Sequence, residues 1–242
     1  MTKRESGEKR GKSAKRLYTL ALEGATYEGS VVLLSDSTVI SERTISPEDA
    51  GIPRIGRGER LMPAVADCLK EAGVKQGEIA RIVCGAGPGS FTSLRVAGSV
   101  AKGLAAGYGV DLFAVSSLLL TVTGANRPLP PGEYLSVLDA MRGEFFAARV
   151  LLQPGGFATQ IEPTTILSAK QLDEAADRDR AVRVIGPGRK NDAHPHARGV
   201  AGVLSSIVES GPVDLASWEP DYGRLAEAQV RWEAAHGRSL IR

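Results

Sequence analysis

The chain has 242 residues, of which 43% are hydrophobic and 24% charged, a balance that is typical of a globular protein with one domain or two small ones. It contains no run of about 18 apolar residues and no apolar core of a signal peptide near its start, so neither a transmembrane helix nor secretion is expected. Cys68 and Cys84 lie in apolar segments and are interpreted as reduced core residues, which favours the cytoplasm.

The net charge of +2 is unevenly distributed along the chain. Residues 1–16 hold seven basic and two acidic residues, so this stretch carries +5 and the remaining chain −3. We expect residues 1–15 to be a disordered, solubilising tail because they have almost no apolar side chains; leaning on RNA is the alternative. The slightly acidic remainder lacks the basic stripe that nucleic-acid binding requires.

The first half of the chain predicts three strands joined by short turns, then a helix, a strand and a second helix. Short apolar runs indicate the strands, and apolar residues at a spacing of four indicate the helices. Leu61, Val65 and Leu69 mark the first helix, which Gly73 ends. The expected segments are strands 17–23, 30–35 and 37–45, a helix over 60–72, a strand over 80–84 and a helix over 92–106.

The second half predicts a smaller α/β unit that begins after residue 109. The segments expected there are strands 111–114, 134–139, 144–152, 160–166 and 181–185, and helices 116–123, 168–176, 197–209 and 225–236. His194 and His196 fall in a loop-like stretch and are interpreted as a solvated pair. The expected organisation is therefore a tail (1–15), a first lobe (16–109) and a second lobe (110–242), with the last helix packing back on the first lobe.

The stretch Gly85–Leu104 (GAGPGSFTSLRVAGSVAKGL) lies between a predicted strand and a predicted helix. Gly85, Gly87 and Gly89 crowd one turn, where glycine permits positive φ and close approach of another backbone or a ligand. Such a turn can bind phosphate at the helix N-terminus, but neither the dinucleotide fingerprint nor the P-loop spacing is present. The alternative is that the glycines only tighten the turn and allow packing.

The helix that follows this turn is apolar on two faces, which predicts burial on two sides. One face runs from Val96 to Leu104, and the other is a smooth face of alanines. We expect the alanine face and part of the preceding helix to form a subunit interface, consisting of Met62, Ala66, Ala97, Ala101 and Ala105. The alternative is that the chain's own last helix covers the alanines.

The same stretch is the basis of a family resemblance. GPGSFTSLR followed by AKGLA closely resembles the GPGSFTGLR…AKGLA signature of the TsaB family of bacterial tRNA threonylcarbamoyladenosine biosynthesis proteins. The signature residues in this chain are Gly87, Pro88, Gly89, Ser90, Phe91, Thr92 and Arg95. The likeness covers most of residues 17–232.

Outside the signature, the resemblance is weaker. Residues 139–144 resemble the family's Asp-Ala-Arg-x-Gly-Glu, and residues 220–224 resemble its Pro-x-Tyr-x-Arg. Glu23-Gly24-Ala25 stands where the first strand of the family usually ends in Asp-Thr-Ser, and Arg57-Gly58 replaces a His-Ser pair. Ser93 replaces a glycine.

The resemblance implies a two-lobed α/β fold of the actin, sugar-kinase and heat-shock-chaperone type, with mixed sheets flanked by helices. It implies a non-catalytic scaffold subunit that is a homodimer when alone, pairs with a catalytic threonylcarbamoyl transferase paralogue and recruits a small ATPase. That machinery modifies the adenosine beside the anticodon of tRNAs that read codons starting with A, so contact with tRNA is indirect. No catalytic residue, cofactor, metal or membrane is expected.

Two other functions stay open at this point. In this superfamily a carboxylate at the end of the first strand holds a metal or water near ATP, so Glu23 and the Gly85–Ser90 turn are the site of an alternative ATP-binding enzyme. A homodimeric adaptor of an unknown partner is the other alternative. A hydrolase is not supported, because Pro88 stands where the first glycine of a Gly-x-Ser-x-Gly elbow around Ser90 would fall.

Overall fold

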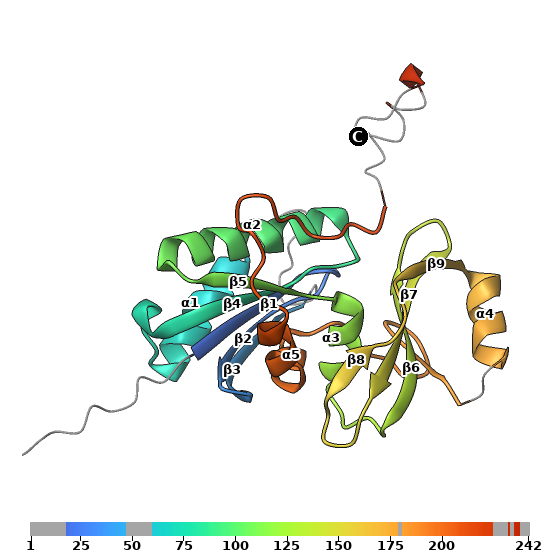
Figure 1. Ribbon diagram of the computed structural model, residues 1–242, viewed down its shortest axis with the longest axis horizontal. Coiled ribbons are helices and arrows are strands. Elements are labelled where there is room, and N and C mark those ends of the chain that lie inside the picture. Colours follow the sequence, from blue (N-terminus) through green and yellow to red (C-terminus); the bar gives the residue numbers. More distant parts are fainter. Residues whose placement is uncertain (1–17, 47–59, 179–180, 225–231, 233–234, 238–242) are drawn as a thin grey trace, which may run out of the picture.

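The computed structural model describes residues 18–46, 60–178, 181–224, 232 and 235–237 of the 242-residue chain. Within these residues the chain forms two mixed sheets, one in each lobe, with helices on their faces (Figure 1). The expected two-lobed α/β fold is therefore confirmed. The predicted tail 1–15, the Arg57-Gly58 pair and most of the predicted helix 225–236 lie outside the described residues.

The first sheet has the strand order β3-β2-β1-β4-β5. Its first three strands form an antiparallel meander, and β4 and β5 run parallel to β1. The strands are β1 (Tyr18–Glu23), β2 (Gly29–Ser35), β3 (Thr38–Ile45), β4 (Ile79–Gly85) and β5 (Asp111–Val115). The helices α1 (Leu61–Ala72) and α2 (Phe91–Tyr108) cover one face, and a 3₁₀ turn, η3 (Gln76–Glu78), precedes β4.

The second sheet has the order β10-β6-β7-β8, with β9 also pairing with β7. Its strands are β6 (Gly132–Asp139), β7 (Glu144–Leu152), β8 (Ala158–Gln160), β9 (Thr165–Ser168) and β10 (Arg183–Ile185). The helix α4 (Ala169–Arg178) covers one face, and α3 (Ser117–Thr123) lies on the other face, between the two sheets (Figure 1). A 3₁₀ helix, η4 (Ala197–Gly202), and α5 (Leu204–Glu209) complete the order.

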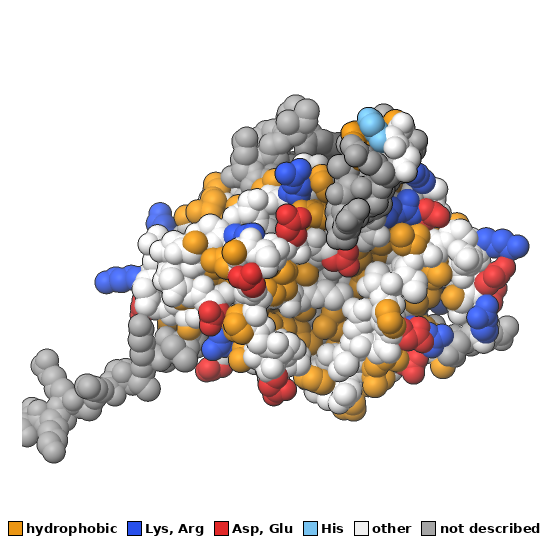
Figure 2. All heavy atoms as spheres, turned by 45° about the horizontal axis from the view of Figure 1, so that its top comes forward, with side chains coloured by type: hydrophobic (Ala, Val, Ile, Leu, Met, Phe, Trp, Pro, Cys, Tyr) orange, Lys and Arg blue, Asp and Glu red, His pale blue; other side chains and the backbone are white. Residues whose placement is uncertain are grey.

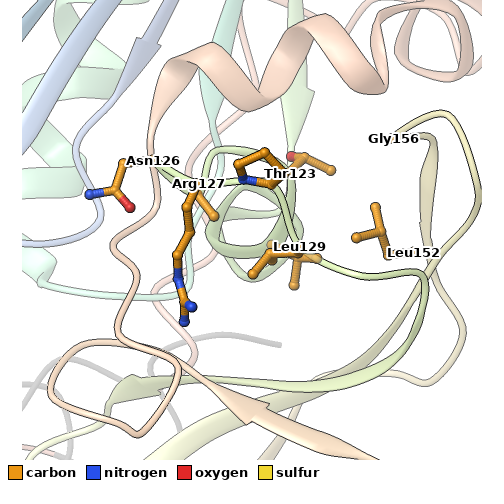
Figure 3. A pocket seen from close by; sticks show the side chains of 9 residues that line it. Thr123, Asn126, Arg127, Leu129, Leu152 and Gly156 are labelled. Atoms are coloured by element: carbon orange, nitrogen blue, oxygen red, sulfur yellow. The ribbon is translucent and has the colours of Figure 1, made fainter.

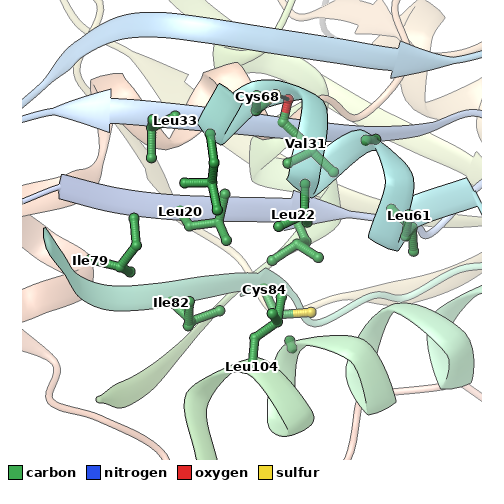
Figure 4. Packing of buried hydrophobic residues seen from close by; sticks show 14 of the residues in the cluster. Leu20, Leu22, Val31, Leu33, Leu61, Cys68, Ile79, Ile82, Cys84 and Leu104 are labelled. Carbon is green, nitrogen blue, oxygen red and sulfur yellow. Dashed lines mark hydrogen bonds between the residues drawn. The ribbon is translucent and has the colours of Figure 1, made fainter. Parts of the chain in front are cut away.

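Strand alternation sends the residues of β1 into two different cores. Leu20 and Leu22 pack toward α1 and α2 together with Cys68 and Ile82, as Figure 4 shows. Burying each such leucine contributes about 1.5–3 kcal/mol. Ala21 points to the opposite face, where a second core runs on through α3, η4 and α5 into the second sheet. The two lobes therefore share one of their cores.

The structure corrects three of the expected boundaries. The first sheet extends past residue 109, because β5 pairs with β4, and η4 and α5 cover its second face. The predicted strand 160–166 is two strands, β8 and β9, on either side of Pro163. The predicted helix 197–209 breaks at Val203 into η4 and α5.

The interpretation of His194 and His196 as a solvated pair is wrong for His196. This side chain is buried, its Nε2 lies 3.0 Å from Thr44 Oγ1 on β3, and its Nδ1 accepts from the Arg198 amide. Burial, with the nearby Arg198 charge, lowers the pKa of His196 to about 3. His196 is therefore a neutral residue of the contact between η4 and the first sheet.

Candidate functional site: the junction of the lobes

The Gly-rich turn that leads from β4 to α2 is packed against the chain's own backbone. A Cβ on Gly87 would overlap the carbonyl oxygen of Asp221, and a Cβ on Gly89 would overlap that of Ala25. The Ser90 amide donates to the same Ala25 oxygen over 2.7 Å. Gly87 and Gly89 therefore allow the neighbouring backbone to pack closely against the turn. This supports the interpretation that the glycines serve packing rather than phosphate binding.

Backbone donors of this turn already have protein acceptors. The Ala86 amide donates to Val115 O over 2.7 Å, and the Gly87 amide donates to Ser117 Oγ over 3.1 Å. A phosphate cradle depends on backbone N–H groups that point at the ligand. In this turn the amides of Ala86, Gly87 and Ser90 point at protein oxygens instead.

Glu23, at the end of β1, is completely buried. Its Oε1 accepts from the Ala25 amide over 2.5 Å and its Oε2 accepts from the Ser117 hydroxyl over 2.9 Å. Burial raises the pKa of Glu23 from 4.5 to about 7, although hydrogen bonds from Ala25, Ser117 and Gly24 oppose this shift. Because both oxygens face protein donors, the carboxyl group has no open side toward a metal or a nucleotide.

Two hollows are lined by described residues, and neither enlarges this site. The one beside Gly24 and Ser93, between the β1–β2 turn and α2, holds about 30 Å³, roughly one water, whereas small-molecule sites are typically about 300–1,000 Å³. A larger, open hollow of about 450 Å³ lies at the other end of α3. Thr123, Leu129 and Leu152 line it, as Figure 3 shows, and none of the predicted site residues does.

A segment near the C-terminus, residues 218–224, crosses from the first lobe to the second; we call it the strap. On the first lobe, Lys102 Nζ donates to Trp218 O over 2.9 Å, and the Asp221 amide donates to Ala86 O over 2.7 Å. Pro220 is buried against Gly98 of α2, where a Cβ would come within 2.9 Å of the proline ring. The strap thus runs along α2 and passes over the Gly-rich turn toward the second lobe.

On the second lobe, the strap meets the strands β6 and β7. Tyr222 joins a small core with Leu138 and Phe146. Arg224 forms an ion pair with Glu144. Gly223 has φ +66°, and a Cβ there would overlap the Phe146 ring, so glycine is required at this position. The segments that resemble the family motifs, 87–95, 139–144 and 220–224, therefore converge at one place.

The signature residues divide into a buried and an exposed part. Gly87 and Pro88 are buried and joined by a cis peptide bond, and Gly89 and Ser90 are half-buried. Ser90 stands at the N-cap of α2 without a side-chain cap, and its hydroxyl instead accepts from Ser93 Oγ over 3.1 Å. The exposed part consists of Phe91, Thr92 and Arg95, with Phe91 4.6 Å from the Tyr222 ring and the Arg95 guanidinium 5.3 Å above Phe91.

The alanine face of α2 is buried within the chain itself. Ala97, Ala101 and Ala105 are at most 1% exposed and pack in the first core beneath the helix. The prediction that these three alanines face a partner is therefore wrong, because the sheet needs the smooth face for close packing. The outer face of α2 carries Thr92, Ser99, Gly103 and Ala106, all exposed. On α1, Met62 is 47% exposed and Ala66 is exposed, as expected.

The charged side chains show no segregation on the face that carries α2 and the strap. Figure 2 shows acidic and basic groups interspersed among hydrophobic ones on this face, without a continuous basic stripe among the described residues. Among the residues that the structure describes, no helix is long and apolar enough to cross a membrane. No group of three or more His, Cys, Asp or Glu side chains that could hold a metal occurs among the described residues.

Comparisons with known proteins agree with this architecture. The family model described as TsaD, tRNA N6-adenosine threonylcarbamoyltransferase, matches residues 40–178, more than half of the chain. The "tRNA threonylcarbamoyladenosine biosynthesis protein TsaB" of Bacillus subtilis is 26% identical over 234 residues, which cover 88% of this chain and 96% of that protein. The protein of the same name from Escherichia coli is 30% identical over 155 residues, 64% of each chain.

Solved structures give the same result. YeaZ from Pseudomonas aeruginosa is 26% identical and superposes with a TM-score of 0.69 over 85% of this chain and 99% of that one. A second structure, described as a protein with similarity to peptidase YEAZ from Pseudomonas aeruginosa, is 27% identical, with a TM-score of 0.72 over 86% and 100% of the two chains. The chain therefore belongs to the TsaB family, within the wider group that the threonylcarbamoyltransferase model describes.

Proposed function

We propose that this protein is the non-catalytic scaffold and dimerisation subunit of the cytoplasmic machinery that forms threonylcarbamoyladenosine beside the anticodon of tRNAs reading codons that start with A. The observation that carries the proposal is the filled junction of the lobes. There the Glu23 carboxyl group and the amides of Ala86, Gly87 and Ser90 bond to the chain's own groups. Relatives from Bacillus subtilis and Escherichia coli bear the name of this tRNA modification.

We infer a scaffold role because the groups described at the lobe junction are already bonded within the chain, whereas an exposed surface remains on the helices of the first lobe. A transferase or ATPase site needs groups that are free to hold a nucleotide, a metal or a reacting atom. Glu23 is fully buried, and the strap covers the turn beside it. A scaffold subunit needs only a rigid framework that presents a binding surface to other proteins.

We place that surface on the outer faces of α1 and α2. Met62 and Ala66 supply the α1 side, and Thr92, Ser99 and Gly103 supply a flat α2 side, where small side chains allow a facing helix to approach closely. The partner is the catalytic threonylcarbamoyl transferase paralogue. A second copy of this chain uses the same surface when the paralogue is absent, and the small ATPase joins the assembled pair. The tRNA is then held mainly by the partners.

Reconstitution tests the function. The isolated protein, incubated with tRNA, threonylcarbamoyl-adenylate and ATP, should form no modified adenosine, and adding the transferase paralogue and the small ATPase should start its formation. Modified adenosine from the isolated protein would refute the non-catalytic role. Equal activity of the other two proteins without this chain would refute the scaffold role.

A charged side chain on α1 tests the surface. Ala66→Arg should leave the free energy of unfolding within about 0.5 kcal/mol of the native value, since the position is exposed, but should abolish dimerisation and pairing with the paralogue. Thr159→Arg, at an exposed position of β8 in the second lobe, is the matched control and should pair normally. Normal pairing of Ala66→Arg in sedimentation experiments would exclude α1 from the interface.

A further inference from the structure

A hollow of about 450 Å³ lies at the C-terminal end of α3, whereas the other end of this helix meets the Gly-rich turn. This volume is within the range of about 300–1,000 Å³ that small-molecule sites occupy. The floor of the hollow consists of Val122 and Leu152, two buried residues of the core that the lobes share, and the partly buried Ala125 and Leu129 form its walls. The rim consists of exposed residues: Asn126, Arg127, Pro128 and Gly156.

The segments around the hollow are held in place by contacts of their own. On one side η4 packs so closely that a Cβ on Gly199 would overlap the Thr123 hydroxyl, and a Cβ on Gly202 would come within 2.7 Å of Gly156 O. On the other side the loop 125–131 contains three prolines, which limit its conformations, and the Tyr134 hydroxyl donates to the carbonyl oxygen of residue 130 over 2.6 Å. The hollow is therefore preformed, so a ligand would not have to order it first.

The lining of the hollow combines one charge with apolar and neutral groups. Among the described residues that line it, Arg127 is the only one with a charged side chain. Arg127 Nη2 lies 3.4 Å from Asn191 Oδ1, a neutral acceptor, and no lining group neutralises the guanidinium charge. The Thr123 hydroxyl donates to Leu119 O over 3.2 Å, so it offers a ligand only an acceptor. The hollow therefore suits a molecule that is mostly apolar and carries one negative charge.

The positions of these groups give such a ligand a direction. Figure 3 shows Arg127 and Leu152 on opposite sides of Leu129. The C-terminal end of α3, at Thr123, carries partial negative charge and disfavours an anion beside it. The anionic group therefore belongs at Arg127, with the apolar part along Leu129. Because a guanidinium forms paired hydrogen bonds with a planar carboxylate, a carboxylate is the matching group.

We propose that this hollow is a binding site for a small aliphatic carboxylate, whose charged group pairs with Arg127 and whose hydrocarbon chain lies over Leu129 toward Leu152. Both parts of the ligand are needed, because the ion pair at an exposed arginine and the apolar contact in an open hollow are each weak alone. The site is independent of the proposed tRNA function, since its lining includes neither the lobe-junction residues nor the outer faces of α1 and α2.

Titration of the full-length protein with octanoate, followed by the methyl resonances of Leu129 and Leu152, tests the site. These resonances should shift and saturate in the millimolar range, whereas those of Met62 and Met141, two exposed apolar residues elsewhere, should not move. Octanol, which lacks the charge, and butyrate, which has fewer methylene groups, should each bind about tenfold or more weakly. Unmoved leucine resonances, shifts of equal size at the methionines, or equal binding of octanoate and either weaker probe would overturn the proposal.

Removing the charge of Arg127 tests the site from the side of the protein. Because Arg127 is exposed, Arg127→Gln should fold normally, and its affinity for octanoate should fall by about tenfold or more while its affinity for octanol stays the same. Arg178→Gln, at an exposed arginine in the last turn of α4, is the matched control and should bind octanoate as the native protein does. Undiminished binding of octanoate to Arg127→Gln, or an equal loss in Arg178→Gln, would contradict the proposal.

Discussion

Replacing Ala101 with glutamate separates a core position from an interface position on α2. Ala101 is fully buried against the first sheet, so the new carboxyl group would have to enter a packed apolar core. Glu23 provides an internal gauge: even with three hydrogen bonds its pKa rises from 4.5 to about 7. A shift of that size costs about 3 kcal/mol near neutral pH, and overpacking adds about 1–3 kcal/mol.

The expected loss of about 4–6 kcal/mol is comparable with the total stability of many domains. Urea unfolding followed by circular dichroism measures this loss. Ser99→Glu, on the exposed face of the same helix, is the control and should change the free energy of unfolding by less than about 0.5 kcal/mol. A folded Ala101→Glu protein with native stability that has lost only its partner would refute the burial of the alanine face.

Two further predictions concern the junction of the lobes. Gly89→Ala should destabilise the protein by about 2–4 kcal/mol in urea unfolding, because the methyl group meets Ala25 O. Gly103→Ala, which has open space around it on the following helix α2, should instead stabilise the protein by about 0.5–1 kcal/mol. Equal effects of the two substitutions would contradict the close packing of the turn. The raised pKa of Glu23 contributes stability that is complete below about pH 4.5 and is lost as the pH rises to about 7. Over this interval the free energy of unfolding of the native protein should fall by up to about 3 kcal/mol relative to that of Glu23→Gln. A difference between the two proteins that does not vary with pH would disprove the pKa shift.

Local patterns predicted most of the elements. The boundaries of β1, β3, α1 and β7 agree with the expected segments to within one residue, because apolar runs, four-residue spacing and a terminal Gly73 specify them locally. The break at Val203 was not predictable in this way. Gly199 lies against Thr123 and Gly124, a contact between residues far apart in sequence.

The site was harder to predict than the fold. The crowding of glycines indicated a close approach, but the sequence does not say whether a phosphate or Asp221 fills the space. The periodicity of α2 indicates two apolar faces but does not show which one meets the sheet. The prediction that the alanines face a partner is therefore wrong, because they pack against the sheet. No sequence pattern indicates that Ser117 belongs to the site, because a single serine at the start of a helix looks the same whether or not it bonds to a buried carboxyl group.

The shared core between the sheets has a consequence for how the chain reaches its native state during synthesis. Ala21, Val32 and Val83 of the first sheet are covered by η4 and α5, which are made about 80 to 90 residues after β5, the last strand of that sheet. Until these late segments leave the ribosome, one side of the nascent sheet exposes an apolar surface. A fragment that stops at β5 would keep that apolar surface exposed, so we expect it to aggregate.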